Sequence, residues 1–181
     1  AHIPNNIATT ESVKTAVEGI QIGGRNLLLN SGRKITNNNY NIAIYELTEE
    51  LKEGDLVTLS IKAQLGNAGS WIEVYNGGTF LTGPRLINGI FTSSFLWKAN
   101  ASPSNLIIYV LSRNGTNNTI EWVKLEKGNK PTDWSPAPED IENKVADIQT
   151  DLQNAINNAK ALIAAESQNI KNSNARIQNL E

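Results

Sequence analysis

The chain has 181 residues, a formal net charge of −2, one histidine, and no cysteine or methionine. This balance, without a basic run, argues against nucleic acid or an anionic membrane as a partner. No apolar run approaches the about 18–20 residues of a membrane span, and thiolate chemistry is excluded. Because no methionine opens the chain, we interpret it as a piece of a longer polypeptide.

A short helical pattern comes first. Residues 9–20 read TTESVKTAVEGI, with Thr9 or Thr10 as a cap and apolar residues at three-to-four spacing. A helix of this length is marginal by itself. We therefore treat residues 1–22 as an N-terminal linker that holds a short helix.

Period-two alternation follows, interrupted by Gly, Asn and Pro clusters at intervals of about 8–12 residues. This spacing predicts a mainly β domain, an antiparallel sandwich, over residues 23–134. Residues 106–111 are apolar on both faces, which predicts a central strand. One strand carries a clean apolar face of Val57, Leu59, Ile61, Ala63 and Leu65. The expected strands are Asn26–Asn30, Tyr40–Leu47, Leu56–Leu65, Ser70–Tyr75, Ile90–Ala99, Leu106–Ser112 and Thr119–Lys127.

A long helix is predicted over residues 135–181. Prolines and two carboxylates, Glu139 and Asp140, suit its first turn, and no Gly or Pro follows Pro138. The apolar stripe includes residues 141, 152 and 163, spaced by 11 residues. That period favours a weak or right-handed supercoil. We expect partner helices to cover the stripe in a homo-oligomer; the alternative is a helix that folds back on the sandwich.

Two phrases of the sequence carry a family resemblance. Ile22–Gly32 reads IGGRNLLLNSG, and Glu121–Asp140 reads EWVKLEKGNKPTDWSPAPED. Together they resemble phrases that frame modules in tail and baseplate proteins of phages of Gram-positive bacteria, accessory baseplate proteins of lactococcal phages above all. The resemblance implies a jelly-roll-like module similar to carbohydrate-binding modules, located in the virion beside other baseplate proteins. Similarity to phage fibres in general implies a parallel trimer.

The sequence offers little for catalysis. The single histidine, His2, lies near the N-terminus, which excludes a Ser–His dyad and a histidine metal site. We therefore predict no enzyme, no cofactor and no metal site; a structural calcium ion, common in jelly-roll carbohydrate-binding modules, stays open. A glycan hydrolase would need two facing carboxylates about 5–10 Å apart. Glu73 and Glu121 are the candidate carboxylates within strands, and no pattern pairs them.

A binding function has better candidates. In SWIEVYNGG, Ile72 and Val74 share one face of a strand, which leaves Trp71, Glu73 and Tyr75 on the other. Aromatic faces stack on pyranose rings while polar groups bond their hydroxyls. We therefore predict a carbohydrate-binding site on this face. The competing interpretation is that its two aromatic rings lie under a neighbouring loop.

Further residues extend this prediction. Tyr109 and Arg113 share a strand face that serves either as a second part of the site or as core. Asn76 and Arg85 are expected as polar donors at the rim. Trp122 and Trp134 are expected to anchor the segment that leaves the sandwich. The predicted ligand is a host cell-surface saccharide; the alternative functions are a structural spacer or docking module and a glycan hydrolase.

Overall fold

The computed structural model describes residues 12, 14, 23–87, 89–99, 105–111 and 116–179. For residues 85–87 it describes the backbone. The chain divides into two compact units, Ala1–Asp140 and Ile141–Glu181. The short helix predicted at residues 9–20 lies outside the described residues, apart from Ser12 and Lys14, which are helical.

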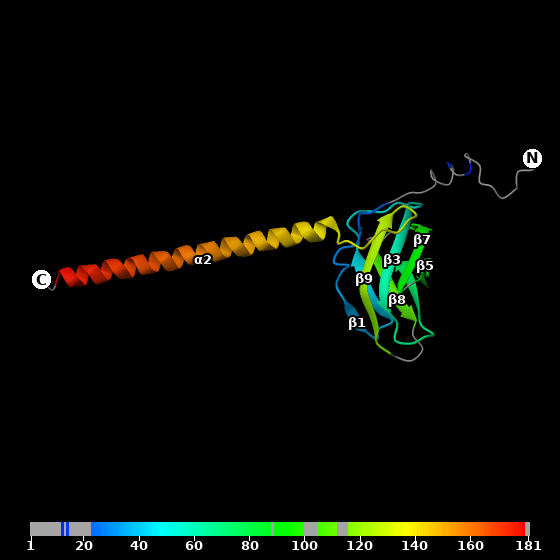
Figure 1. Cartoon of the computed structure of the whole chain (residues 1–181), viewed down its shortest axis with the longest axis horizontal. Coiled ribbons are helices and arrows are strands. Elements are labelled where there is room, and N and C mark those ends of the chain that lie inside the picture. Colours follow the sequence, from blue (N-terminus) through cyan, green and yellow to red (C-terminus); the bar gives the residue numbers. More distant parts are fainter. Residues whose placement is uncertain are drawn as a thin grey trace, which may run out of the picture. The chain divides into compact units, whose positions relative to one another are not determined.

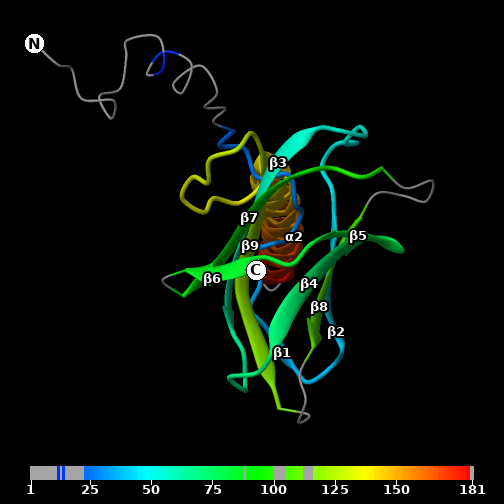
Figure 2. The ribbon, with the colours of Figure 1, turned by 90° about the vertical axis from the view of Figure 1, so that its right-hand side faces the viewer.

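The first unit contains two antiparallel sheets that face each other (Figure 1, Figure 2). The five-stranded sheet has the order β1 (Ile35–Asn37), β9 (Asn118–Lys127), β3 (Leu56–Gln64), β7 (Ile90–Leu96) and β6 (Arg85–Ile87). The four-stranded sheet has the order β2 (Asn41–Glu46), β8 (Asn105–Leu111), β4 (Trp71–Asn76) and β5 (Thr79–Thr82). The predicted mainly β fold is confirmed.

The core lies between the two sheets and follows the alternation of the sequence. On β3, Val57, Leu59 and Ile61 are fully buried, and Ala63 and Leu65 lie against them, as predicted. Strand β8 is central in its sheet, again as predicted. Its inward side chains join those of β4 and β9 in a single apolar cluster that includes Leu106, Ile108, Val110, Ile72, Val74, Val123 and Leu125.

The strand predicted at Asn26–Asn30 is wrong. This segment makes a single bridge, between Leu28 and Leu47. Its backbone donors are divided among three different acceptors, since Leu27 N bonds Leu125 O, Leu28 N bonds the Asn26 side chain and Leu29 N bonds Glu46 O. Asn30 then adopts a positive φ of 54°, which ends any extended run. The short strands β1, β5 and β6 were not predicted, because each is too short to establish a period.

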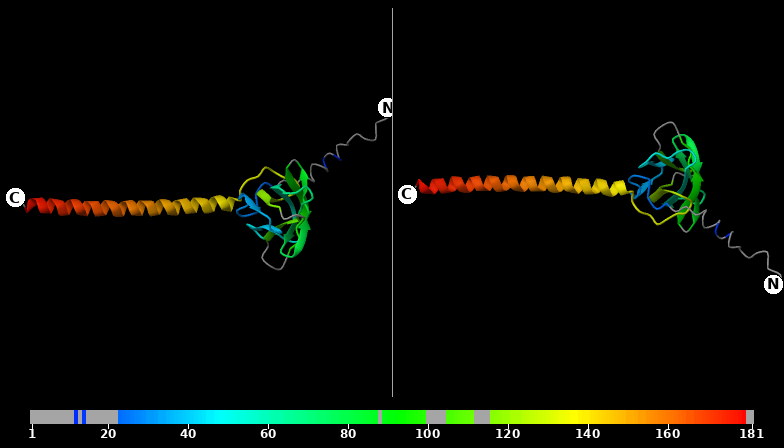
Figure 3. Two further views of the ribbon diagram at one scale, coloured as in Figure 1. Left: turned by 90° about the horizontal axis from the view of Figure 1, so that it is seen from below. Right: turned by 90° about the horizontal axis from the view of Figure 1, so that it is seen from above.

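Most of the second unit is formed by helix α2 (Pro138–Gln178), a continuous helix of 41 residues (Figure 3). The long helix predicted over residues 135–181 is therefore confirmed, beginning at Pro138. Glu139 and Asp140 lie in its first turn and Arg176 in its last, where each charge opposes the helix dipole. Among the described residues, no helix combines the length and the apolar character that crossing a membrane requires.

A buried polar cluster joins the two ends of the sandwich domain. Lys124 and Glu126 are on the outer face of β9, yet both are buried, with Nζ and Oε2 3.8 Å apart. The Lys124 ammonium donates to Thr132 Oγ1 and Asp133 O, each at 2.6 Å. The Glu126 carboxylate accepts from Gly24 N at 2.7 Å and from the backbone and hydroxyl of Thr132 at 2.8 and 2.7 Å.

Asn26, which lies in the segment before β1 together with Gly24, extends this cluster. Its side-chain amide donates to Ser31 Oγ at 2.8 Å and Ser135 O at 2.9 Å, while its Oδ1 accepts from Leu125 N at 3.3 Å. Below we call Gly24, Asn26, Lys124, Glu126 and Thr132 the junction cluster. It places the two phrases that carry the family resemblance in direct contact.

Two further contacts fix the start of α2. The Asn30 backbone N–H donates to both Asp140 carboxylate oxygens at 3.0 Å, and Arg25 forms an ion pair with Glu139. The ring centroids of Trp122 and Trp134 lie 6.4 Å apart, and Trp134 Nε1 donates to Val123 O at 3.2 Å. The anchoring function expected for these two tryptophans agrees with these contacts.

The first prediction concerns Gly32, which lies directly against Trp134. A β-carbon added at Gly32 would come within 2.5 Å of Trp134 Cζ2, so the indole must move. We expect Gly32→Ala to lower the free energy of unfolding by about 1–3 kcal/mol, measured by urea denaturation followed by tryptophan fluorescence. Gly78→Ala is the control, because a β-carbon there meets nothing within 4 Å. Equal denaturation midpoints for the two variants would contradict the anchoring function of Trp134.

Candidate functional site

The outer face of the four-stranded sheet carries the residues that the sequence singled out. On β4, Ile72 and Val74 point into the core and are almost completely buried. Strand alternation therefore turns Trp71, Glu73 and Tyr75 outward, and Trp71 is 42% exposed. The competing interpretation places both Trp71 and Tyr75 under a neighbouring loop; Trp71 is exposed, whereas Tyr75 is half-buried.

The register between β4 and β8 places Tyr109 on the same surface. Glu73 lies opposite Tyr109 on β8, and Tyr75 lies opposite Phe80 on β5. Tyr109 thus faces outward, while its neighbours Ile108 and Val110 enter the core. Tyr109 of the second candidate strand face and Glu73 of the first therefore lie on one surface.

Five aromatic side chains make up this surface, which we call the aromatic platform: Tyr40, Trp71, Tyr75, Phe80 and Tyr109. The Tyr75 ring meets Tyr109 and Phe80 edge to face, with centroids 5.1 and 5.4 Å apart. Tyr109 in turn contacts Tyr40 at 4.8 Å. Tyr40 is 58% exposed and Phe80 44%. Folded proteins rarely expose large apolar groups side by side without a function for them.

Glu73 lies among the aromatic rings and forms hydrogen bonds with two of their side chains. Its carboxylate accepts a hydrogen bond from Trp71 Nε1 and another from the Tyr75 hydroxyl, both at 3.1 Å. Desolvation raises the pKa of Tyr75 above its ordinary value, and the hydrogen bond to Glu73 and the charge of Glu73 raise it further. The carboxylate therefore restrains both rings while it keeps lone pairs available for a ligand.

Lys98 supplies a positive charge at one edge of the platform. Its ammonium donates to Phe80 O at 3.1 Å and lies 6.0 Å from the centroid of the Phe80 ring, within the range of a cation–π contact. Lys98 was not predicted, nor were Tyr40 and Phe80. The hairpin signal of Gly77-Gly78 could have located Phe80, because a short turn there pairs it with Tyr75.

Asn76 corrects the predicted rim of the site. It is buried, and its amide donates to Lys98 O at 3.0 Å while its Oδ1 accepts from Asn105 N at 3.3 Å. The alternation already places residue 76 with Ile72 and Val74 on the inward face, so Asn76 ties loops together and does not reach a ligand. The Arg85 side chain and all of Arg113 lie outside the described residues.

The two strand carboxylates that the sequence singled out lie on different sheets. Glu73 belongs to the four-stranded sheet, whereas Glu121 belongs to the five-stranded sheet and pairs with Lys62 at 2.8 Å. These two carboxylates therefore do not face each other across a cleft. In the part of the chain that the structure describes, no group of three or more His, Cys, Asp or Glu residues could hold a metal ion.

The second prediction concerns the ionisation of Tyr75. Replacing Glu73 with Gln removes the adjacent negative charge, so the pKa of Tyr75 should fall toward its ordinary value of 10.0. A raised pKa favours the protonated phenol in the fold, so its stabilisation is present below pH 10 and is lost as the pH rises through the folded-state pKa. Alkaline NMR titration of labelled tyrosine rings measures the change.

Tyr45 is the internal control of that titration. Burial raises its pKa to about 12, and Glu73 is not among the groups that shift it. The Tyr45 resonance should therefore titrate identically in both proteins. An unchanged pKa of Tyr75 in Glu73→Gln would contradict the coupling between the carboxylate and the platform.

Comparison with known proteins does not assign a function to the chain. No protein-family model matches the chain, and no curated protein matches it.

Proposed function

We propose that this chain is a non-catalytic saccharide-binding module, and the aromatic platform is the observation that carries the proposal. Pyranose rings present apolar C–H faces that stack on aromatic side chains. Trp71, Tyr75 and Tyr109 offer such faces on one surface, with the Glu73 carboxylate among them as a hydrogen-bond acceptor. A few fixed polar groups within an apolar surface give a site its orientation and specificity.

The biological setting is proposed from the sequence phrases. Ile22–Gly32 and Glu121–Asp140 resemble phrases of phage tail and baseplate proteins, and their contact through the junction cluster supports reading them as one structural unit. In this setting the module is jelly-roll-like and belongs to the virion, among other baseplate proteins. Its ligand is a cell-wall or surface polysaccharide of a Gram-positive host, and its function is to assist adhesion.

Oligomerisation through α2 completes the proposal. From Ile141 onward the residues of α2 that the structure describes are all exposed, and its apolar stripe includes Ile148, Leu152 and Ile156, exposed by 65, 59 and 40%. An apolar stripe on a helix is stabilised by burial against other helices. We assign the stripe to a parallel homotrimer, in which several weak platforms bind one polymer with a higher combined affinity.

A structural spacer or docking module is the second candidate. Exposed Trp and Tyr side chains are also enriched at the centres of protein interfaces, so the platform could be covered by another baseplate protein. This candidate predicts that the platform binds protein and no saccharide. Nothing in the geometry favours the glycan hydrolase, because Glu73 and Glu121 lie on different sheets.

The third prediction tests the saccharide directly. Trp71→Ala should weaken binding of host wall polysaccharide about tenfold or more, which corresponds to about 1.4 kcal/mol, measured by isothermal titration calorimetry. Leu96→Ala is the control, since Leu96 is 59% exposed and belongs to the other sheet. If the intact protein binds no wall polysaccharide, or if both variants bind as tightly as the unchanged protein, the saccharide proposal fails.

The fourth prediction tests the trimer. Replacing both Ile148 and Leu152 with Asn puts amides into the apolar stripe, so the protein should dissociate to monomers in sedimentation equilibrium. Ala161→Asn is the control, because residue 161 lies on the side of the helix opposite the stripe. A monomeric unchanged protein, or a trimer that survives the double replacement, would contradict the assignment.

A further inference from the structure

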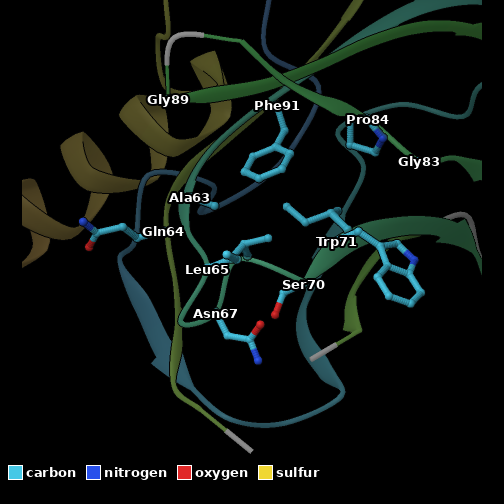
Figure 4. Close-up of a pocket in the computed structure, with 12 residues that line it drawn as sticks. Ala63, Gln64, Leu65, Asn67, Ser70, Trp71, Gly83, Pro84, Gly89 and Phe91 are labelled. Atoms are coloured by element: carbon cyan, nitrogen blue, oxygen red, sulfur yellow. The ribbon is translucent and has the colours of Figure 1, made fainter. Parts of the chain in front are cut away.

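A cleft opens at one end of the sandwich, beside the platform. Its volume is about 730 Å³, within the range of roughly 300–1,000 Å³ that is usual for small-molecule sites. Residues from both sheets line it, including Ile72 from β4 and Phe91 from β7. In Figure 4 the Phe91 and Leu65 side chains point into the cleft.

The walls of the cleft select against a fully hydroxylated sugar. Leu65, Ile72, Pro84 and Phe91 offer no hydrogen bond, and hydroxyl groups buried against them would lose their water without gaining partners. An apolar substituent has no hydrogen bonds to lose there, and its transfer from water to the cleft is favourable. The lining therefore fits an apolar group attached to a polar ligand.

One polar atom in the cleft lacks a partner. Among the described residues, the Ser70 hydroxyl oxygen is buried and makes no hydrogen bond. Asn67, another lining residue, lies next to it in Figure 4. A ligand that combines a methyl group with an amide would place the methyl against the apolar walls and satisfy Ser70 with the amide.

The cleft and the platform share a strand. Trp71 and Ile72 are consecutive on β4, so their side chains leave it on opposite faces, Trp71 toward the platform and Ile72 toward the cleft. Trp71 lines the rim of the cleft, and Figure 4 shows its indole turned away from Phe91 and Leu65. A sugar stacked on Trp71 therefore has the cleft next to it.

We propose that this cleft receives the acetamido group of an N-acetylated sugar whose ring stacks on Trp71. The inference rests on the proposed saccharide-binding function and adds the substrate class to it. The platform supplies affinity for the ring, while the cleft distinguishes acetylated amino sugars from plain hexoses.

Chitotetraose and cellotetraose test this inference, since they share a linkage and differ by acetamido groups in place of hydroxyls. The intact protein should bind chitotetraose about tenfold more tightly than cellotetraose, the usual discrimination for one small apolar group in a pocket. Ala68→Phe fills the mouth of the cleft from an exposed position. It should abolish the preference and leave the affinity for cellotetraose unchanged.

Two variants complete the experiment. Ala161→Phe, the same replacement on the exposed surface of α2, should keep the preference. Ser70→Ala should weaken chitotetraose binding about fivefold without changing cellotetraose binding. A chitotetraose affinity that Ser70→Ala leaves intact overturns the pairing of Ser70 with the amide.

The outcomes separate this inference from the proposed function. Equal affinities of the intact protein for the two tetrasaccharides, or a preference that persists in Ala68→Phe, overturn the acetamido cleft alone. Binding of host wall polysaccharide without binding of either tetrasaccharide also overturns it and leaves the saccharide function standing. Absence of binding to all three ligands overturns both.

Discussion

The buried ion pair of Lys124 and Glu126 is the constraint on which the arrangement of this molecule depends. Two charges removed from water destabilise a fold unless hydrogen bonds satisfy them. Here Thr132 and Gly24 supply those bonds, one from the segment after β9 and the other from the segment before β1. The charges can therefore be buried only when both segments are in place.

In the opposite sheet, one strand contributes both to the core and to the aromatic platform. The inward face of β4 contributes Ile72 and Val74 to the core, which fixes the backbone that carries Trp71 and Tyr75. The Glu73 carboxylate then restrains both rings through hydrogen bonds. Rings that are already ordered lose little conformational entropy when a ligand binds. The platform is thus preorganised by interactions that exist without any ligand.

The sequence predicts features that depend on neighbouring residues of one strand, such as which face is buried. It does not predict features that depend on partners far away in the chain, such as strand register. The alternation of β3 and β4 gave their faces, because strand geometry alone decides them. It could not give the register that places Tyr109 opposite Glu73, or that brings Tyr40 onto the platform. Asn26–Asn30 looked like a strand because its apolar residues are consecutive, yet Leu27 N bonds Leu125 O of β9 while Leu29 N bonds Glu46 O of β2. Asn76 was misjudged although the period was sufficient to place it.

The attachment of α2 has a mechanical consequence. Any force that pulls on the chain beyond Asp140 passes first through Asp140 to the Asn30 backbone, and through Trp134 and Thr132 to β9. Strand β9 is bonded along its length to β3, so the load would act on many hydrogen bonds together. The part of the route through Trp134 and Thr132 ends in the five-stranded sheet, whereas the Asn30 segment also bonds Glu46 of β2 in the four-stranded sheet. Tension on α2 would therefore be divided between the two sheets, and β9 would take the share that passes through Trp134 and Thr132.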